Sequence, residues 1–156
     1  MTTPSMTNDE IIAKAKALVT TLKQPYLMAT ASPDGRPHIR WMGAFLFKEP
    51  FTIYLETFLN SRKVEDIRAN PNVELLLSTP DFSQQVALLG TAVIDDNNEI
   101  RNEVYQAITA SDKYFSGSDD PDLGVIRLEV KQVELWLHRD QREPITAKCE
   151  EVVVHG

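Results

Sequence analysis

Three apolar, β-rich segments follow one another between residues 26 and 57 with only short turns between them. The first two segments, 26–31 and 38–47, flank a Pro-Asp-Gly tripeptide, a sequence that strongly favours a tight turn. The third segment, 51–57, follows a second short turn that contains Pro50. Parallel neighbours need a crossover of a dozen or more residues, usually a helix, so these three strands are predicted to pair antiparallel.

The rest of the chain continues this mainly β pattern. Three more strands are predicted at 73–78, 85–94 and 125–137. Three helices are predicted from apolar residues three and four apart, at 7–23, at 61–69 and from Asn97 onward. About six strands with short turns and few helices predict a six-stranded antiparallel barrel with peripheral helices.

A single domain is expected, because a chain of 156 residues suits one hydrophobic core. We assign it residues 1–156, with the barrel at about 26–140 and a C-terminal tail at 141–156. The polar segment 111–122 is predicted to be a loop. The last strand should alternate without interruption, with one face formed by Val125, Arg127, Glu129, Lys131 and Val133 and the other by Ile126, Leu128, Val130 and Gln132.

The charge of the chain excludes some partners and favours one kind of ligand. A formal net charge of −7 argues against nucleic acid, because a phosphate backbone needs a basic face. From Asp95 to the end there are 14 acidic and 7 basic side chains, whereas residues 33–70 hold 6 basic and 5 acidic ones. An anionic ligand is therefore expected in the first half of the chain.

The cysteine and histidine content points to a cytoplasmic protein without a metal. Cys149 is the single cysteine, so no internal disulfide can form, and a lone thiol fits a reducing compartment. The N-terminus lacks the basic start and apolar stretch of a signal peptide, and no apolar run has the length of a membrane span. The three histidines lie far apart and show no metal-ligand spacing.

The segment 57–63 carries the most specific chemical signal. A predicted strand runs here into a predicted helix start, and Thr57, Ser61, Arg62 and Lys63 gather at the junction. A helix start offers unpaired backbone N–H groups and a partial positive charge, which suit a phosphate, and the two cations would add charge-assisted hydrogen bonds. Taken alone, the segment also fits an ordinary helix cap with solvated cations.

Other motifs narrow the choice of ligand. There is no Gly-x-Gly-x-x-Gly sequence after a strand and no Walker-type phosphate loop. Three features outside the 57–63 segment are candidates for a binding role, namely Arg40-Trp41-Met42 on a strand, Gln85 at the start of another and Trp136 near the end of the last. Each of these has an ordinary structural explanation when it is read alone.

Together and in order, these features resemble the pyridoxamine 5′-phosphate oxidase-like superfamily of FMN-binding split barrels, in particular its general stress protein 26-like branch. The matching strings are Ala29-Thr-Ala-Ser-Pro-Asp-Gly-Arg-Pro-His-Ile-Arg-Trp-Met42, Ser61-Arg-Lys-Val-Glu-Asp-Ile-Arg-Ala-Asn-Pro71 and Val133-Glu-Leu-Trp136. The resemblance covers residues 26–137. It implies a six-stranded split barrel that acts as a homodimer with FMN at the subunit interface.

The resemblance also implies roles for individual residues. The FMN phosphate would be held by Thr57, Ser61, Arg62 and Lys63. The isoalloxazine ring and the ribityl chain would lie against Arg40, Trp41 and Met42. The partner subunit would contribute Gln85 at the polar edge of the ring and Trp136 over the ring.

The expected function is that of a flavin-dependent oxidoreductase of the general stress type, which acts on an unknown small redox substrate. Pyridoxamine phosphate oxidases carry an Arg-x-His-Asp motif, whereas this chain has Leu137-His-Arg-Asp140, so that particular oxidation is not expected. Three alternatives stay open at this point. They are a flavin-binding or flavin-storing stress protein without turnover, a reductase that uses the deazaflavin F420, and a barrel with a degenerate cleft.

Overall fold

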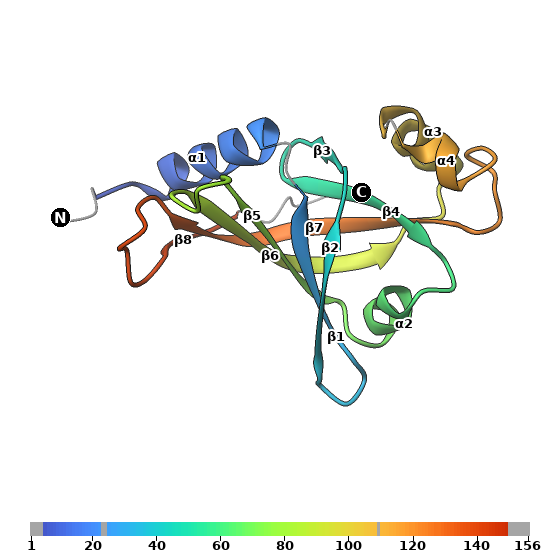
Figure 1. Ribbon diagram of the computed structural model, residues 1–156, viewed down its shortest axis with the longest axis horizontal. Helices are drawn as coiled ribbons and strands as arrows, with labels where there is room; N and C mark the ends of the chain where they lie inside the picture. Colours follow the sequence, from blue (N-terminus) through green and yellow to red (C-terminus); the bar gives the residue numbers. More distant parts are fainter. Residues whose placement is uncertain (1–4, 23–24, 109, 150–156) are drawn as a thin grey trace, which may run out of the picture.

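The computed structural model describes residues 5–22, 25–108 and 110–149, and these form one eight-stranded sheet with four helices around it (Figure 1). The strands are β1 (Tyr26–Ala31), β2 (Pro37–Met42), β3 (Leu46–Lys48), β4 (Thr52–Phe58), β5 (Asn72–Ser78), β6 (Gln85–Ile94), β7 (Leu123–Trp136) and β8 (Ile145–Lys148). The helices are α1 (Asn8–Thr21), α2 (Arg62–Ala69), α3 (Asn98–Ala107) and α4 (Ser111–Tyr114).

All neighbouring strands pair antiparallel, in the order β2-β1-β5-β6-β7-β4-β3, and β8 pairs with β7. This confirms the predicted antiparallel fold but corrects the number of strands from six to eight. The predicted segment 38–47 is broken at residues 43–45 into β2 and β3. The segment expected as a C-terminal tail contains β8, in which Ala147 is buried in the main core.

Two further boundaries differ from the sequence prediction. The predicted loop 111–122 begins with the short helix α4. Its N-cap residue is Ala110, which makes no side-chain cap, so the sequence had no capping signal for this helix. Helix α1 ends at Thr21 with Leu22 as its C-cap residue, and Lys23, the last residue of the predicted helix, lies outside the described residues.

The largest core lies inside the curled sheet, and α1 closes one end of it. Helix α1 begins after Thr7, whose hydroxyl accepts a hydrogen bond from the Glu10 amide at 3.1 Å. Its buried stripe is Ile11, Ala15, Leu18 and Val19. Figure 1 shows α1 beside β8 at one end of the molecule and α3 with α4 at the other end. Among the described helices, none combines the length and apolar character that crossing a bilayer would require.

Strand β7 changes its inward face at a bulge. Leu89 pairs with Gln132 and Gly90 pairs with Val130, so Lys131 is an extra residue on β7. The predicted uninterrupted alternation is therefore wrong beyond Lys131, and Val133 points into the core in place of Gln132. Gly90 is needed opposite this bulge, because a Cβ atom there would overlap the backbone carbonyl of Glu129.

Two features of this fold position the candidate site. Strand β2 is an edge of the sheet, and its residues alternate between an inner face with His38, Arg40 and Met42 and an outer face with Ile39 and Trp41. Strand β4 leads directly into α2, which packs against β1 and β6. The predicted cations of β2 and α2 therefore lie on neighbouring elements.

Candidate functional site

The junction between β4 and α2 forms a row of hydroxyl and ammonium groups. Ser61 is the N-cap residue of α2, but its side chain makes no capping hydrogen bond within the described part of the chain. Its Oγ instead lies 3.3 Å from Oγ1 of Thr57, and Nζ of Lys63 donates to the same Thr57 oxygen at 2.8 Å. The first backbone N–H groups of a helix have no acceptor within the helix, so the start of α2 combines such donors with two hydroxyls and an ammonium group.

Arg40, which the resemblance assigned to the flavin ring and ribityl chain, lies within electrostatic reach of Arg62 and Lys63. We call these three residues, Arg40, Arg62 and Lys63, the cation cluster. Burial lowers the pKa of Arg40, and the charge of Arg62 lowers it further, while Asp66 opposes the shift. Burial also lowers the pKa of Lys63, and the charge of Arg40 adds to this effect. Arg40 thus interacts with both of the other cations, and Arg40 and Lys63 are partly buried, so the cluster would gain stability from a bound anion.

The guanidinium group of Arg40 is held by only one of its nitrogens. Nη1 donates to Oγ1 of Thr30 at 2.9 Å, to the Met28 carbonyl at 3.3 Å and to the His38 carbonyl at 3.4 Å. Within the described residues, Nη2 and Nε make no hydrogen bond, and Nη2 lies 3.9 Å from the Asp66 carboxylate. The ion pair of Nη2 with Asp66 is longer than a hydrogen bond, so the N–H groups of Nη2 and Nε keep their capacity to bond an anion. We call this the free half of the guanidinium group, in the sense that it makes no hydrogen bond within the described residues.

The buried carboxylate of Asp66 lies beside Arg40. Oδ2 of Asp66 accepts a hydrogen bond from the Thr30 hydroxyl at 2.7 Å and lies 2.8 Å from Nδ1 of His38. Burial raises the pKa of Asp66, but the hydrogen bonds from His38 and Thr30 and the charges of His38 and Arg40 outweigh burial and leave this pKa below its ordinary value. Asp66 is thus an ionised group, only 2% exposed, that faces the cation cluster.

Sequence reasoning missed Thr30, His38 and Asp66. One signal was available, because alternation along β2 places His38 on the same face as Arg40. The role of Asp66 had no such signal, since its burial follows from the packing of α2 against β1.

The structure separates Trp41 from Arg40 and Met42, with which the resemblance grouped it. Trp41 is 68% exposed on the outer face of β2, beside Ile39, which is 64% exposed. Met42 lies on the inner face and packs against the main core. An inner-face ligand near Arg40 could therefore reach only the backbone of residue 41.

Gln85 and Trp136 also lie on the outer face, at one end of β6 and β7. They are direct cross-strand partners. Trp136 lines a shallow hollow together with Ile39 and Ala87. Among the contacts of the described residues, neither Gln85 nor Trp136 touches the cation cluster of its own chain.

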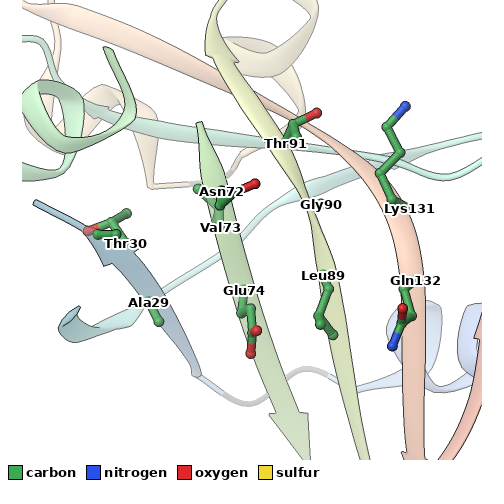
Figure 2. Close-up of a pocket in the computed structure, with 11 residues that line it drawn as sticks. Ala29, Thr30, Asn72, Val73, Glu74, Leu89, Gly90, Thr91, Lys131 and Gln132 are labelled. Atoms are coloured by element: carbon green, nitrogen blue, oxygen red, sulfur yellow. The ribbon is translucent and has the colours of Figure 1, made fainter. Parts of the chain in front are cut away.

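The middle of the outer face is hollow. Figure 2 shows Ala29, Glu74, Leu89 and Gln132, which come from the four neighbouring strands β1, β5, β6 and β7 and line a depression of about 430 Å³. Burial raises the pKa of Glu74, and the nearby charge of Glu134 raises it further. Elsewhere in the described chain, no group of three His, Cys, Asp or Glu side chains comes together as a metal site.

Comparison with known proteins agrees with this architecture. The sequence pattern of the family described as pyridoxamine 5′-phosphate oxidase matches residues 14–137, which is most of the chain. This chain belongs to the pyridoxamine 5′-phosphate oxidase family. The family assignment made from the Ser61-to-Pro71 string and its companions is thereby confirmed, including the similarity to general stress protein 26.

Two relatives within this family illustrate the similarity. General stress protein 26 of Bacillus subtilis (strain 168) is 30% identical over 115 residues, which cover 72% of this chain and 79% of that protein. A pyridoxine/pyridoxamine 5′-phosphate oxidase of Sphingopyxis alaskensis is 34% identical over 145 residues. The match covers 90% of this chain but only 55% of that oxidase, so this chain spans about half of its length.

A solved structure of the family has the same fold. It is a pyridoxamine 5′-phosphate oxidase-related, FMN binding protein of Nostoc punctiforme PCC 73102, with a TM-score of 0.64 and 21% identity. The similarity covers 90% of this chain and 95% of that one, so the architecture is shared over nearly the whole length of both.

Proposed function

We propose that this chain binds FMN through the cation cluster and acts as a flavin-dependent oxidoreductase. The observation that carries the proposal is the gathering of Lys63 with the hydroxyls of Thr57 and Ser61 at the start of α2, next to Arg62 and within electrostatic reach of Arg40 on β2. A phosphate monoester carries about −1.5 to −2 charges and several acceptor oxygens, which match these donors.

The rest of FMN also suits the surroundings of this cluster. Strand β2 is an edge strand in the described sheet, so part of its backbone is free to bond the polar rim of a flat ring. When bound, FMN would supply the two-electron redox chemistry itself, and the protein would bind and orient it. Support also comes from the family member described as FMN binding.

A homodimer is part of this proposal. Trp41, Gln85 and Trp136 lie on an outer face that one chain alone leaves open. A second copy that covered this face would bring its Gln85 and Trp136 toward a flavin held near β2. Ile39 and Trp41, both more than half exposed, would then be covered.

The substrate is proposed to be a small redox molecule in the cytosol. Pyridoxamine phosphate oxidation is not proposed, because Leu137-His-Arg-Asp140 lacks the Arg-x-His-Asp order and the chain spans about half of the oxidase from Sphingopyxis. Two alternatives would use the same cation cluster. One is flavin storage without turnover, and the other is binding of F420, which also carries a phosphate.

Titration calorimetry with FMN, riboflavin and FAD tests the ligand. FMN should bind tightest, because riboflavin lacks the phosphate and FAD lacks a terminal one. The double variant Arg62→Ala/Lys63→Ala should weaken FMN binding by about 2–5 kcal/mol and leave riboflavin binding nearly unchanged.

A matched control removes the same charge elsewhere. Arg68 and Lys113 are both exposed, and Arg68→Ala/Lys113→Ala should bind FMN like the unchanged protein. FAD binding as tight as FMN binding, or full flavin occupancy in the Arg62/Lys63 variant, would overturn the phosphate assignment.

A further inference from the structure

Thr30, His38 and Asp66 form a polar group that the proposed flavin site does not itself use. Thr30 on β1 and His38 on β2 are direct cross-strand partners, and both reach Oδ2 of Asp66 on α2. The Thr30 hydroxyl donates to Asp66 and accepts from Nη1 of Arg40. A continuous hydrogen-bonded path thus joins helix α2 to the guanidinium group of Arg40.

The physical need for this path lies in the charge of the cluster. Arg40 has a long, flexible side chain, and two further cations repel it. Without hydrogen bonds and an ion pair to fix it, the guanidinium group would turn toward water, where its charge is better solvated. Thr30 fixes one nitrogen of the fork, and the Asp66 carboxylate offsets part of the repulsion at 3.9 Å.

The same path fixes its own members. Asp66 is 2% exposed and Thr30 is 3% exposed, so neither can exchange these hydrogen bonds for water without opening the contact between α2 and β1. His38 lies 2.8 Å from the same oxygen of Asp66. Because a carboxylate only accepts and a guanidinium only donates, the Thr30 hydroxyl has one orientation, with its proton toward Asp66 and a lone pair toward Arg40.

We propose that Thr30, backed by Asp66 and His38, is a positioning residue that presents the free half of the Arg40 guanidinium group to the phosphate of the ligand. This inference rests on the proposed function. Thr30 does not touch the ligand; it acts through Arg40. It should therefore contribute to the binding of a phosphate-bearing flavin and not to the binding of the flavin ring.

The test measures the ratio of riboflavin to FMN dissociation constants in the whole protein. Thr30→Val keeps the shape of the side chain and removes the hydroxyl, and it should lower this ratio roughly fivefold or more. Thr30→Ser restores the hydroxyl and should restore the ratio. A residue with only a structural role would weaken both ligands together and leave the ratio unchanged.

A double-mutant cycle shows whether the effect passes through Arg40. In an Arg40→Met background, Thr30→Val should change the ratio less than about twofold, because the side chain it positions is gone. An undiminished loss in that background would overturn the inference. If Thr30→Val does not fold, as judged by thermal unfolding, Thr30→Ala with Thr30→Ser as the rescue gives the same comparison.

The outcomes separate this inference from the proposed function. If the unchanged protein binds riboflavin as tightly as FMN, the phosphate site itself is wrong. If FMN selectivity is present and is lost in Arg62→Ala/Lys63→Ala but survives Thr30→Val, the flavin site stands and only the positioning role is wrong.

Discussion

At the scale of single residues, the proposed site depends on Arg40 and Lys63, two charged side chains that are partly buried before any ligand binds. Lys63 donates to Thr57 and has a pKa lowered first by burial and then by the charge of Arg40. A lowered lysine pKa means that the protonated form is disfavoured in the protein without ligand. A phosphate beside Nζ would favour the protonated form again, so binding and protonation are coupled.

This coupling predicts the pH dependence of FMN binding. The bound pKa of Lys63 should exceed the free pKa, so between these two values binding takes up a proton and affinity falls as pH rises. Below the free pKa, Lys63 is charged in both states and adds no slope. We expect FMN to bind more weakly as pH is raised toward the ordinary lysine pKa of about 10.

Riboflavin is the reference for this measurement, because its ring titrates like that of FMN but it has no phosphate. The decline in the ratio of riboflavin to FMN dissociation constants should disappear in Lys63→Met. An equally steep decline in that variant would show that another group is responsible.

Some residues of the candidate site could be predicted from the sequence and others could not. Thr57, Ser61, Arg62 and Lys63 could be grouped from sequence because they are close along the chain and meet at a strand-to-helix junction. Trp41 received the same role as Arg40 from the family resemblance, whereas alternation along β2 sends the two side chains to opposite faces. Asp66 could not be found, because its partners lie 28 and 36 residues away in the sequence.

At the scale of elements, strands with clear apolar patterns were predictable and irregular positions were not. Strand β1 and strand β6 have the predicted bounds, 26–31 and 85–94. The bulge at Lys131 was missed, because local alternation does not show that the partner strand holds one residue fewer. Strand β8 was missed because four residues of mixed character become a strand only through pairing with β7.

The bulge gives a prediction about stability. Gly90→Ala would place a methyl group against the backbone carbonyl of Glu129, and relief would require moving β6 away from β7. We expect this change to lower the free energy of unfolding by at least about 2 kcal/mol, measured by urea denaturation.

Gly43→Ala is the matched control. The methyl group that this change adds would have no neighbouring atom within 4 Å, so stability should change by less than about 0.5 kcal/mol. Equal stability of the two variants would mean that the strands do not approach closely at Gly90.

At the scale of the whole molecule, the sheet presents two faces with different chemistry. The inner face of β2 and the start of α2 hold the cation cluster, whereas the outer face holds Trp41, Gln85 and Trp136. One chain does not bring these two sets together among its described contacts. The flavin site that we propose, built from both sets, would need a second copy of the chain, and a two-fold dimer would form two such sites reciprocally.

Mixing two defective variants tests this arrangement. One chain carries Arg62→Ala/Lys63→Ala, and the other carries Gln85→Ala/Trp136→Ala. Each homodimer should bind FMN poorly, because both of its sites lack one half. A mixed dimer would contain one intact site and one site that lacks both halves, so FMN binding should recover to at most about one site per mixed dimer.

The experiment requires that the two chains be unfolded and refolded together, and that mixed dimers be isolated with two different affinity tags. Refolded mixtures of each variant with itself show the background, and the unchanged protein shows that refolding preserves FMN binding. If verified mixed dimers recover no binding, or if either variant alone binds fully, the outer face does not contribute to the flavin site. In that case Trp41, Gln85 and Trp136 belong to a surface with another purpose, and the cation cluster must hold its ligand with residues of a single chain.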